Sequence, residues 1–200
     1  EAAYAIAAEI SGEVVVERYI PGKDYRMLVI GNKLIAAARR DPPQVIGDGL
    51  HSVSQLVDQV NSDPRRGEGH ANSLTKIHFD EIALGHLTTQ GLTAESILPK
   101  SARIFLRNNA NLSTGGTATD VTDDVHPEIA ARVEAAAQMI GLDICGVDVV
   151  CNSLSNPLEE QGGVIEINAA PGLRMHLQPS FGERRPVGEA IIDNMFKGGD

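Results

Sequence analysis

The fold is decided by two stretches, Gly-Val-Asp-Val-Val-Cys at residues 146–151 and Gly-Gly-Val-Ile-Glu-Ile-Asn at residues 162–168. Each is a short run rich in Val and Ile, which predicts a buried β-strand, and a polar loop joins them. Side chains alternate along a strand, so Glu166 and Asn168 fall on one face of the second strand. Asp148 interrupts the apolar run of the first. The sequence therefore predicts two neighbouring strands that carry oxygen-bearing side chains where apolar ones are expected.

These oxygen-bearing side chains suggest a metal site. Charged side chains are rarely buried unless they are paired or bound to a metal. The oxygens of Asp148, Glu166 and Asn168 can converge across the two strands, and hard oxygen ligands suit Mg²⁺ that is also held by phosphate. The alternative is three ordinary polar residues at strand ends. We favour the metal site, because two of the residues share a face and the third lies inside an apolar run.

The composition narrows the class of protein. The chain has 200 residues, 42% hydrophobic and 22% charged, which is typical of a globular protein with one large or two small domains. A net charge of −10 argues against nucleic-acid binding. No apolar run is long enough to span a membrane, and two cysteines do not form a disulfide framework. We expect no nucleic-acid or membrane partner, a cytoplasmic location and, since the chain begins with Glu1, a longer parent protein.

Hydrophobic periodicity predicts an α+β domain. Gly31-Asn32 is expected to turn a β-hairpin, and Ser52 to cap a helix. Polar loops are expected at 61–76 and 108–119. Strands are predicted at residues 14–20, 25–30, 33–38, 104–107, 144–151 and 163–168. Helices are predicted at residues 1–10, from Ser52 through Val60, and at 79–90, 126–140 and 186–196, with Ile129, Val133, Ala136, Ala137 and Ile140 on the inner face of the fourth.

Three further features have open interpretations. The Gly- and hydroxyl-rich segment 111–117 can present backbone N–H groups to an anion, or be a plain surface loop, and it is not a Walker motif. Arg107 can bind phosphate or carboxylate, or form a salt bridge at a rim. The backbone of residues 17–20 can pair with an adenine edge, or form a surface strand. No zinc-ligand spacing and no Gly-x-Ser-x-Gly elbow occurs, so a zinc enzyme or a serine hydrolase is not expected.

Over nearly its whole length the sequence resembles the ATP-grasp ligases. The Glu-x-Asn pair is shared by many members of that family, whereas the Asn-Leu-Ser-Thr-Gly-Gly and Ala-Ala-Pro-Gly-Leu-Arg-Met-His segments are more specific. The resemblance rests on residues 16–26, 45–49, 63–70, 74–77, 110–123 and 166–176.

The resemblance implies an ATP-grasp fold, with residues 1–200 as the C-terminal portion of the domain in a longer multidomain chain. That lobe has an antiparallel sheet flanked by helices. It also implies ATP and Mg²⁺ as cofactors, and a ligase that joins a carboxylate to an amine through an acyl phosphate. The branch that the sequence resembles adds aspartate to a growing acidic peptide primer, and we expect a homo-oligomer in the full-length enzyme. The alternatives are another ATP-grasp peptide or amino-acid ligase, or a catalytically incomplete nucleotide-binding fragment.

By position, the resemblance implies that Asp148, Glu166 and Asn168 bind Mg²⁺. Glu17 and the backbone of Arg18 to Ile20 would meet adenine.

Other roles implied by the resemblance concern the ribose, the transferred phosphate and the acceptor. Asp24 would contact the ribose, and Arg107 would steady the transferring phosphate. Asn111 to Gly116 would line the site near the acceptor, while Arg174 and His176 would bind the peptide or aspartate carboxylates. The phosphate-binding Lys and Gly-rich loop of the preceding ATP-grasp lobe do not occur in this sequence, so we expect weak nucleotide binding by the chain alone.

Overall fold

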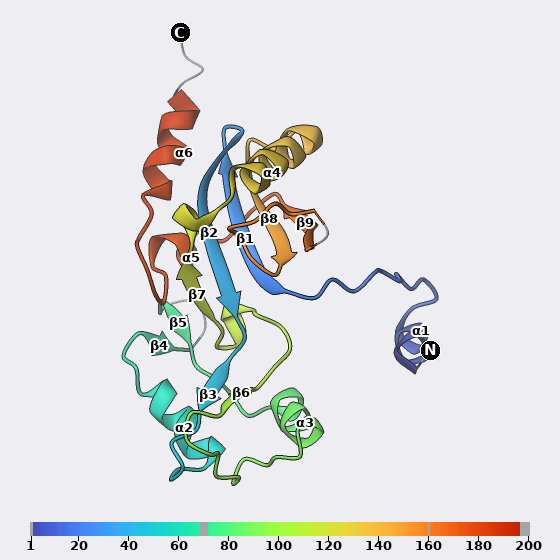
Figure 1. Ribbon diagram of the computed structural model, residues 1–200, viewed down its shortest axis with the longest axis vertical. Coiled ribbons are helices and arrows are strands. Elements are labelled where there is room, and N and C mark those ends of the chain that lie inside the picture. Colours follow the sequence, from blue (N-terminus) through green and yellow to red (C-terminus); the bar gives the residue numbers. More distant parts are fainter. Residues whose placement is uncertain (1, 69–71, 160, 197–200) are drawn as a thin grey trace.

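The computed structural model describes residues 2–68, 72–159 and 161–196, and it shows a five-stranded sheet with a smaller lobe below it (Figure 1). The sheet has the order β7-β2-β1-β8-β9, and every neighbouring pair is antiparallel. Its strands are β1 (Lys23–Ile30), β2 (Lys33–Asp41), β7 (Thr117–Asp120), β8 (Ile144–Cys151) and β9 (Gly162–Asn168). The two strands that opened the sequence analysis are confirmed, and β7 was missed.

The hairpin between β1 and β2 forms as predicted. Gly31 has a φ of 56° and Asn32 a φ of 64°. Positive φ at both central residues is the requirement of a type I′ turn, which matches the right-handed twist of the flanking strands. The turn pairs Ile30 with Lys33, and a register shift between Leu28 and Val29 then places Arg26 of β1 opposite Ala38 of β2.

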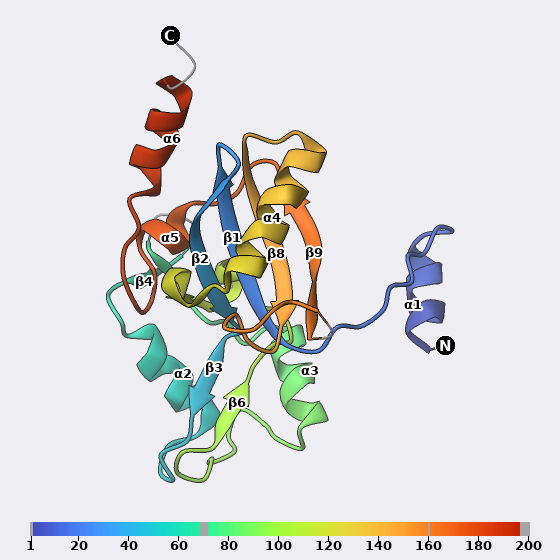
Figure 2. The same cartoon turned by 45° about the horizontal axis from the view of Figure 1, so that its top comes forward.

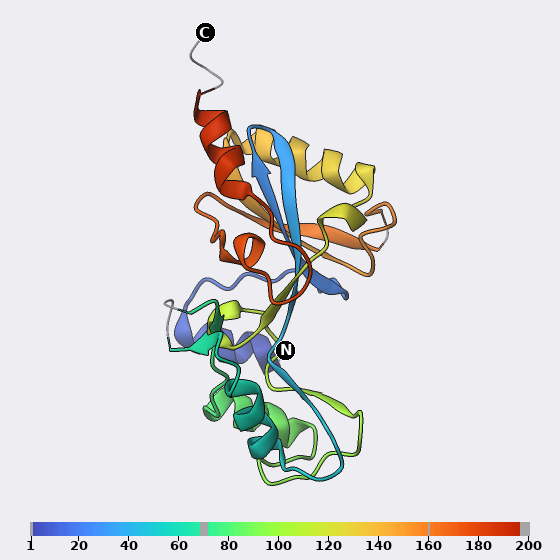
Figure 3. The same ribbon diagram turned by 90° about the vertical axis from the view of Figure 1, so that its left-hand side faces the viewer.

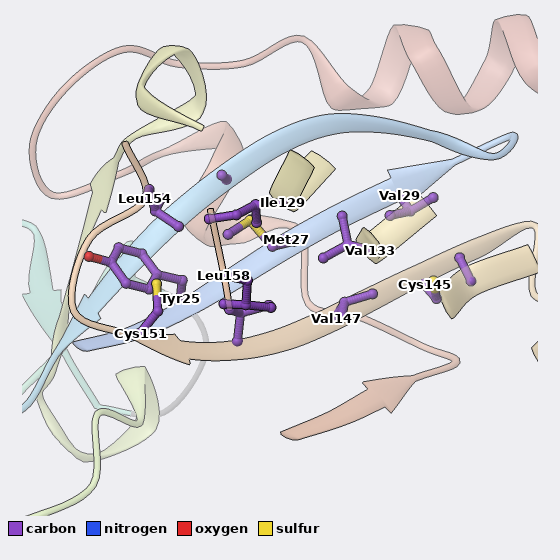
Figure 4. Close-up of a cluster of buried hydrophobic side chains, with 13 residues drawn as sticks. Tyr25, Met27, Val29, Ile129, Val133, Cys145, Val147, Cys151, Leu154 and Leu158 are labelled. Carbon is purple, nitrogen blue, oxygen red and sulfur yellow. The ribbon is translucent and has the colours of Figure 1, made fainter. Parts of the chain in front are cut away.

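One face of the sheet is covered by helix α4 (Pro127–Ile140), which begins after His126 and ends at Gly141 in the left-handed region. Ile129, Val133 and Ala137 are buried as predicted, whereas Ile140, in the last turn, is 60% exposed. Figure 4 shows the resulting core, where side chains of α4 meet those of β1 and β8. The members from the two strands are Tyr25, Met27, Val29, Cys145, Val147, Val149 and Cys151.

The opposite face is covered by two helices near the C-terminus. Figure 3 shows the sheet between α4 and α6 (Val187–Phe196). Val187 packs on Leu28 and Ile30 of β1. The short helix α5 (Arg174–Leu177), which was not predicted, places Met175 against Ala38 and Ala118.

The smaller lobe has its own core. It contains a two-stranded sheet of β3 (Gln44–Ile46) and β6 (Arg103–Phe105), with α2 (Val53–Asn61) and α3 (Glu81–Thr89) packed on it. Ser52 caps α2 in a capping box with Gln55, as its position predicted.

The polar segments of this region are more ordered than expected. The predicted loop 61–76 contains two short parallel strands, β4 (Arg66–Gly67) and β5 (Leu74–Thr75). Residues 69–71 lie outside the described residues, and they include His70, which belongs to a segment that carries the family resemblance. Segment 108–119 contains a 3₁₀ turn, η1 (Leu112–Thr114), before β7 begins. A second 3₁₀ turn, η2 (Thr122–Asp124), follows β7.

The predicted strand at 14–20 is wrong. These residues form no strand, and Val15, Val16 and Tyr19 are 79–85% exposed. The segment links α1 (Ala2–Ile10) to β1, and α1 stands away from the sheet (Figures 1 and 2). Strand-forming side chains do not make a strand without a neighbour for the backbone hydrogen bonds, and the described part of the chain places none beside this segment. Within that part, no helix has the length and apolar character needed to cross a membrane.

Candidate functional site

A row of charged side chains crosses the face of the sheet opposite α4. Asp148 of β8 is the register partner of Arg26 on β1 and of Glu166 on β9. Directly opposed residues of antiparallel strands point to the same face. Gly146 is likewise opposite Asn168, so the three predicted metal ligands share one face. The sheet therefore brings Asp148, Glu166 and Asn168 together as the alternation pattern predicted.

Asp148 is held by two arginines. Arg26 forms a fork on it, with Nε donating to Oδ1 and Nη2 donating to Oδ2 at 3.2 Å. Arg40 Nη2 donates to Oδ2 at 2.9 Å. Asp148 is only 7% exposed, and Arg26 only 9%. The negative charge inside this apolar strand is thus compensated by protein, which is the condition for burying it.

Glu166 and Asn168 lie on the edge strand and are more open. Asn168 Nδ2 donates to Glu166 Oε1 at 3.0 Å, which fixes the amide beside the carboxylate. Glu166 is exposed, and Asn168 is half-buried. The amide oxygen of Asn168 and the second carboxylate oxygen of Glu166 receive no hydrogen bond from the described residues.

The donor set fits a hard divalent cation. A carboxylate offers about four lone-pair positions, and the two arginines use three of those on Asp148. One position remains on Oδ1, so Asp148 can act as a single-oxygen ligand beside Glu166 and Asn168. Three side-chain oxygens leave room for phosphate or water oxygens, as Mg²⁺ prefers. No group of three or more His, Cys, Asp or Glu in the described chain is arranged to hold a metal, so this mixed set is the candidate.

Arg40 connects this row to a cavity of about 310 Å³. Arg40 Nε donates to Asp24 Oδ1 at 2.6 Å, while its Nη2 reaches Asp148. Burial alone would lower the pKa of Arg40, but the carboxylates of Asp24 and Asp148 outweigh burial and raise it. Asp24 and Asn111 line the same cavity, together with Lys23. Asp24, predicted to contact the ribose, and Asn111, predicted to lie near the acceptor, therefore border the same space.

A second cavity, of about 390 Å³, is lined in part by η1. Leu112 and Ser113 line it, together with Arg174, whose Nη1 donates to the carbonyl of Asn72. Asn111 thus borders the first cavity while the residues after it border the second. The Asn-Leu-Ser-Thr-Gly-Gly segment thus contributes to the linings of both cavities.

Gly115 and Gly116 let this segment turn back tightly. Gly115 has a φ of 98°, and a Cβ there would lie 2.6 Å from Ile77 Cγ1. A Cβ on Gly116 would lie 2.8 Å from the carbonyl oxygen of Asn111 and 2.9 Å from that of Asp41. Only glycine allows the turn to fold back so tightly.

Arg107 forms no hydrogen bond or ion pair with the charged row in the part of the chain that the structure describes. It is 7% exposed and forms an ion pair with Asp80, whose carboxylate also accepts a hydrogen bond from Ala83 N at the start of α3. The backbone N–H of Ala83 and the guanidinium of Arg107 hold the pKa of Asp80 below its ordinary value. Of the two interpretations of Arg107, the structure shows the ion pair.

The residues expected to meet adenine are not assembled with the others. Glu17 and Arg18 are exposed on the segment before β1. Ile20 lies near the edge strand, since a Cβ on Gly163 would come within 2.8 Å of its Cδ1. None of the three lines the cavity of Asp24 and Asn111.

His176 is buried instead of facing a substrate. It is 1% exposed, and neither ring nitrogen has a hydrogen-bond partner in the described chain. Burial, with the nearby charge of Arg26, lowers the pKa of His176 to about 4. The ring is therefore uncharged near neutral pH and offers no positive charge to a carboxylate.

Sequence reasoning missed Arg26 and Arg40. The signal was present, because Arg26 interrupts the apolar strand 25–30 as Asp148 interrupts its own strand. An acidic and a basic residue, each inside an apolar run, are an expected buried pair. The predicted strand 33–38 ended before Arg40, whereas β2 continues through it to Asp41.

Comparisons with known proteins agree with this arrangement. No protein-family model matches the chain. The cyanophycin synthetase of Synechocystis sp. is 50% identical over 99% of this chain, which covers 23% of that protein. The glutathione biosynthesis bifunctional protein GshAB of Clostridium perfringens is 38% identical over 97% of the chain, which covers 25% of that protein. The chain therefore spans about a quarter of the length of these curated relatives.

A solved structure supports the fold directly. The crystal structure of a bifunctional glutathione synthetase from Pasteurella multocida matches 90% of this chain with a TM-score of 0.76 and 37% identity, and 25% of that chain is covered. The sheet, the covering helices and the smaller lobe are thus an arrangement found in a known ligase.

Proposed function

Because this chain has the ATP-grasp fold and is homologous to a segment of the cyanophycin synthetases, we propose that it forms part of an ATP-dependent ligase that adds aspartate to an acidic peptide primer. The observation that carries the proposal is the row of Arg26, Asp148 and Glu166, which Arg40 joins to the first cavity. A nucleotide site beside a cation site needs this combination of carboxylates and guanidinium groups.

The reaction proposed is carboxylate activation followed by amide formation. A carboxylate oxygen of the primer attacks the terminal phosphorus of ATP, and ADP leaves, which gives an acyl phosphate. The amine of aspartate then attacks the acyl carbon, phosphate leaves, and the amine loses a proton. Neither step requires a nucleophilic side chain, which agrees with the absence of a catalytic Ser or Cys motif.

The proposed ligand-binding residues belong to two groups, one at each cavity. In the first, Asp24 binds the ribose hydroxyls, and Lys23 and Arg40 meet the phosphates. Asp148, Glu166 and Asn168 would hold Mg²⁺ beside that cavity. When bound, the cation neutralises charge on the phosphate oxygens.

The second cavity suits the acceptor. Arg174 supplies a positive charge on its wall, and Ser113 supplies a hydroxyl. Guanidinium groups bind carboxylates with two parallel hydrogen bonds, so an acidic peptide is the class of ligand this wall recognises. We assign Asn111, which borders the first cavity just before η1, to contact the reacting groups.

A second candidate is a ligase of the glutathione type, because GshAB and the glutathione synthetase structure match nearly as much of the chain. The higher identity to cyanophycin synthetase favours the aspartate ligase. Substrate preference in one assay, with either an aspartate primer or the precursors of glutathione, separates the two.

The test is ATP-dependent incorporation of aspartate into a short aspartate primer by the full-length enzyme. Glu166→Gln and Asp148→Asn each remove a carboxylate from the cation site, and we expect incorporation to fall by about a hundredfold or more. Glu189→Gln, an exposed acid on α6, is the matched control and should retain the activity. Undiminished incorporation by either site variant would refute the cation assignment.

A further inference from the structure

The charge of Asp148 is already balanced before any cation arrives. Its Oδ2 accepts hydrogen bonds from Arg26 Nη2 at 3.2 Å and from Arg40 Nη2 at 2.9 Å, and its Oδ1 accepts one from Arg26 Nε. A cation that approached Asp148 alone would meet two guanidinium groups at close range. Like charges repel most strongly where water is excluded, and Asp148 is only 7% exposed.

The place of Arg26 is built into the strand. Gly146 lies on β8 beside it, and a Cβ there would be 2.9 Å from Arg26 Cδ and 2.9 Å from Pro171 Cβ. Glycine at this position lets the arginine lie flat over the sheet. The side chain is 11% exposed, so its guanidinium is directed to Asp148 and not to solvent.

Arg40 has a different position. Its Nε holds Asp24 and its Nη2 holds Asp148, while the described residues give its Nη1 no hydrogen bond. Arg40 lines the first cavity with Lys23 and Asn111. Among the residues that the structure describes, Arg40 is thus the one that both hydrogen-bonds to Asp148 and lines the space proposed for the nucleotide.

We propose that Arg26 and Arg40 set the order of ligand binding: they keep a divalent cation from binding alone, and Arg40 binds the phosphates of the anionic nucleotide with which the cation then enters. The proposal rests on the proposed function, because it takes Asp148 and Glu166 as cation ligands. A bound diphosphate adds several negative charges to the cavity. These charges offset the arginines, and the cation then meets a net attraction.

The experiment measures two affinities in the full-length protein. Mn²⁺ binding without nucleotide is followed by electron paramagnetic resonance of the free ion, and ADP binding without metal is followed by calorimetry. In Arg26→Gln and in Arg40→Gln, Mn²⁺ alone should bind about tenfold more tightly, because a repelling charge is gone. Arg40→Gln should also weaken ADP binding by roughly tenfold, and Arg40→Lys should restore most of it.

Arg39→Gln is the matched control. Arg39 is next to Arg40 on β2, and its substitution by Gln removes the same charge. Its side chain, however, pairs with Asp41 and lies on the other face of the sheet. Neither affinity should change in this variant by more than about twofold. Circular dichroism of each variant establishes that it is folded, and Arg40→Gln tests the same claim should Arg26→Gln fail to fold.

A decrease or no change in Mn²⁺ affinity in the folded glutamine variants would overturn the proposal, since the arginines would then position Asp148 without excluding the cation. Glu166→Gln, measured with Mn²⁺ and ADP together, separates this failure from that of the proposed function. If Glu166→Gln weakens Mn²⁺ binding while Arg26→Gln does not strengthen it, only the binding order is wrong. If Glu166→Gln has no effect, the cation site itself is wrong.

Discussion

The two faces of the five-stranded sheet use the same strands for opposite purposes. Towards α4, Met27 and Val147 are fully buried in an apolar core. One residue away on each strand, Arg26 and Asp148 point to the other face and form a buried ion pair. Apolar burial accounts for stability on the first face. A buried ion pair is often no more stabilising than apolar residues of similar size, so stability alone does not explain the second face.

This difference separates residues that maintain the fold from residues of the proposed site. On the α4 face, any well-packed apolar side chain of the right volume would do. On the opposite face, the pairing of charges is specific: Arg40 bridges two carboxylates, and Gly146 makes room for Arg26. Substitutions on the two faces should therefore fail in different ways.

The largest effect is expected on breaking the pair from one side. Arg26→Ala leaves Asp148 with one arginine in a buried position, and we expect a loss of about 3–5 kcal/mol in the free energy of unfolding. The double change Arg26→Met with Asp148→Leu removes both charges and should return stability to within about 1 kcal/mol of the parent chain. Urea unfolding of the three proteins measures both values.

The neighbouring Met27→Ala is the control from the other face. It removes a fully buried side chain and should cost about 2–5 kcal/mol. Adding Asp148→Leu to Met27→Ala should not recover that loss, because a cavity is not relieved by removing a charge on the opposite face. If Asp148→Leu restored the stability of the Met27→Ala chain as fully as it does in combination with Arg26→Met, the two faces of the sheet would not be independent.

The second effect depends on pH and concerns His176, which lies on the charged face. Its pKa in the folded chain is about 4, below the ordinary 6.5. The unfolded chain therefore binds more protons between these values, and stability is full above about pH 6.5 and falls as pH drops towards 4, by up to about 3 kcal/mol. His176→Leu removes this dependence.

Urea unfolding at about pH 7 and about pH 4.5 tests this. The parent chain should lose more stability between the two pH values than His176→Leu does. His78→Gln, which changes an exposed histidine, should behave like the parent. The same loss in His176→Leu as in the parent would place the acid sensitivity elsewhere in the molecule.

Local patterns predicted those parts of the molecule that local interactions determine. The type I′ turn at Gly31 and Asn32 and the capped helix after Ser52 follow from backbone preferences of a few residues. Alternation along a strand correctly put Glu166 and Asn168 on one face, and buried polarity marked Asp148.

Patterns failed where a partner distant in the sequence decides the outcome. Residues 14–20 have strand-forming side chains but no neighbouring strand, so they remain exposed. Segment 117–120 reads as a loop but becomes β7, because it pairs with the end of β2. Arg107 pairs with Asp80, 27 residues earlier, a partner that its own segment does not reveal, and its role at the phosphate stays a prediction. The pairing of Arg26 with Asp148 spans 122 residues, and no local window contains it.

The smallest effect is expected from Arg39→Gln. Arg39 and Arg40 are adjacent on β2 and carry the same charge, but the side chain of Arg39 is 33% exposed and pairs with Asp41 alone, at 3.0 Å. Ion pairs open to solvent contribute about 0–1 kcal/mol and are weakened by salt, so urea unfolding should show a loss in that range that shrinks at high ionic strength. Arg39 lies on the other face of the sheet, and its partner Asp41 is more exposed than Asp148. If Arg39→Gln lost as much stability as Arg26→Ala, the importance of an arginine in this sheet would not depend on its lying on the charged face.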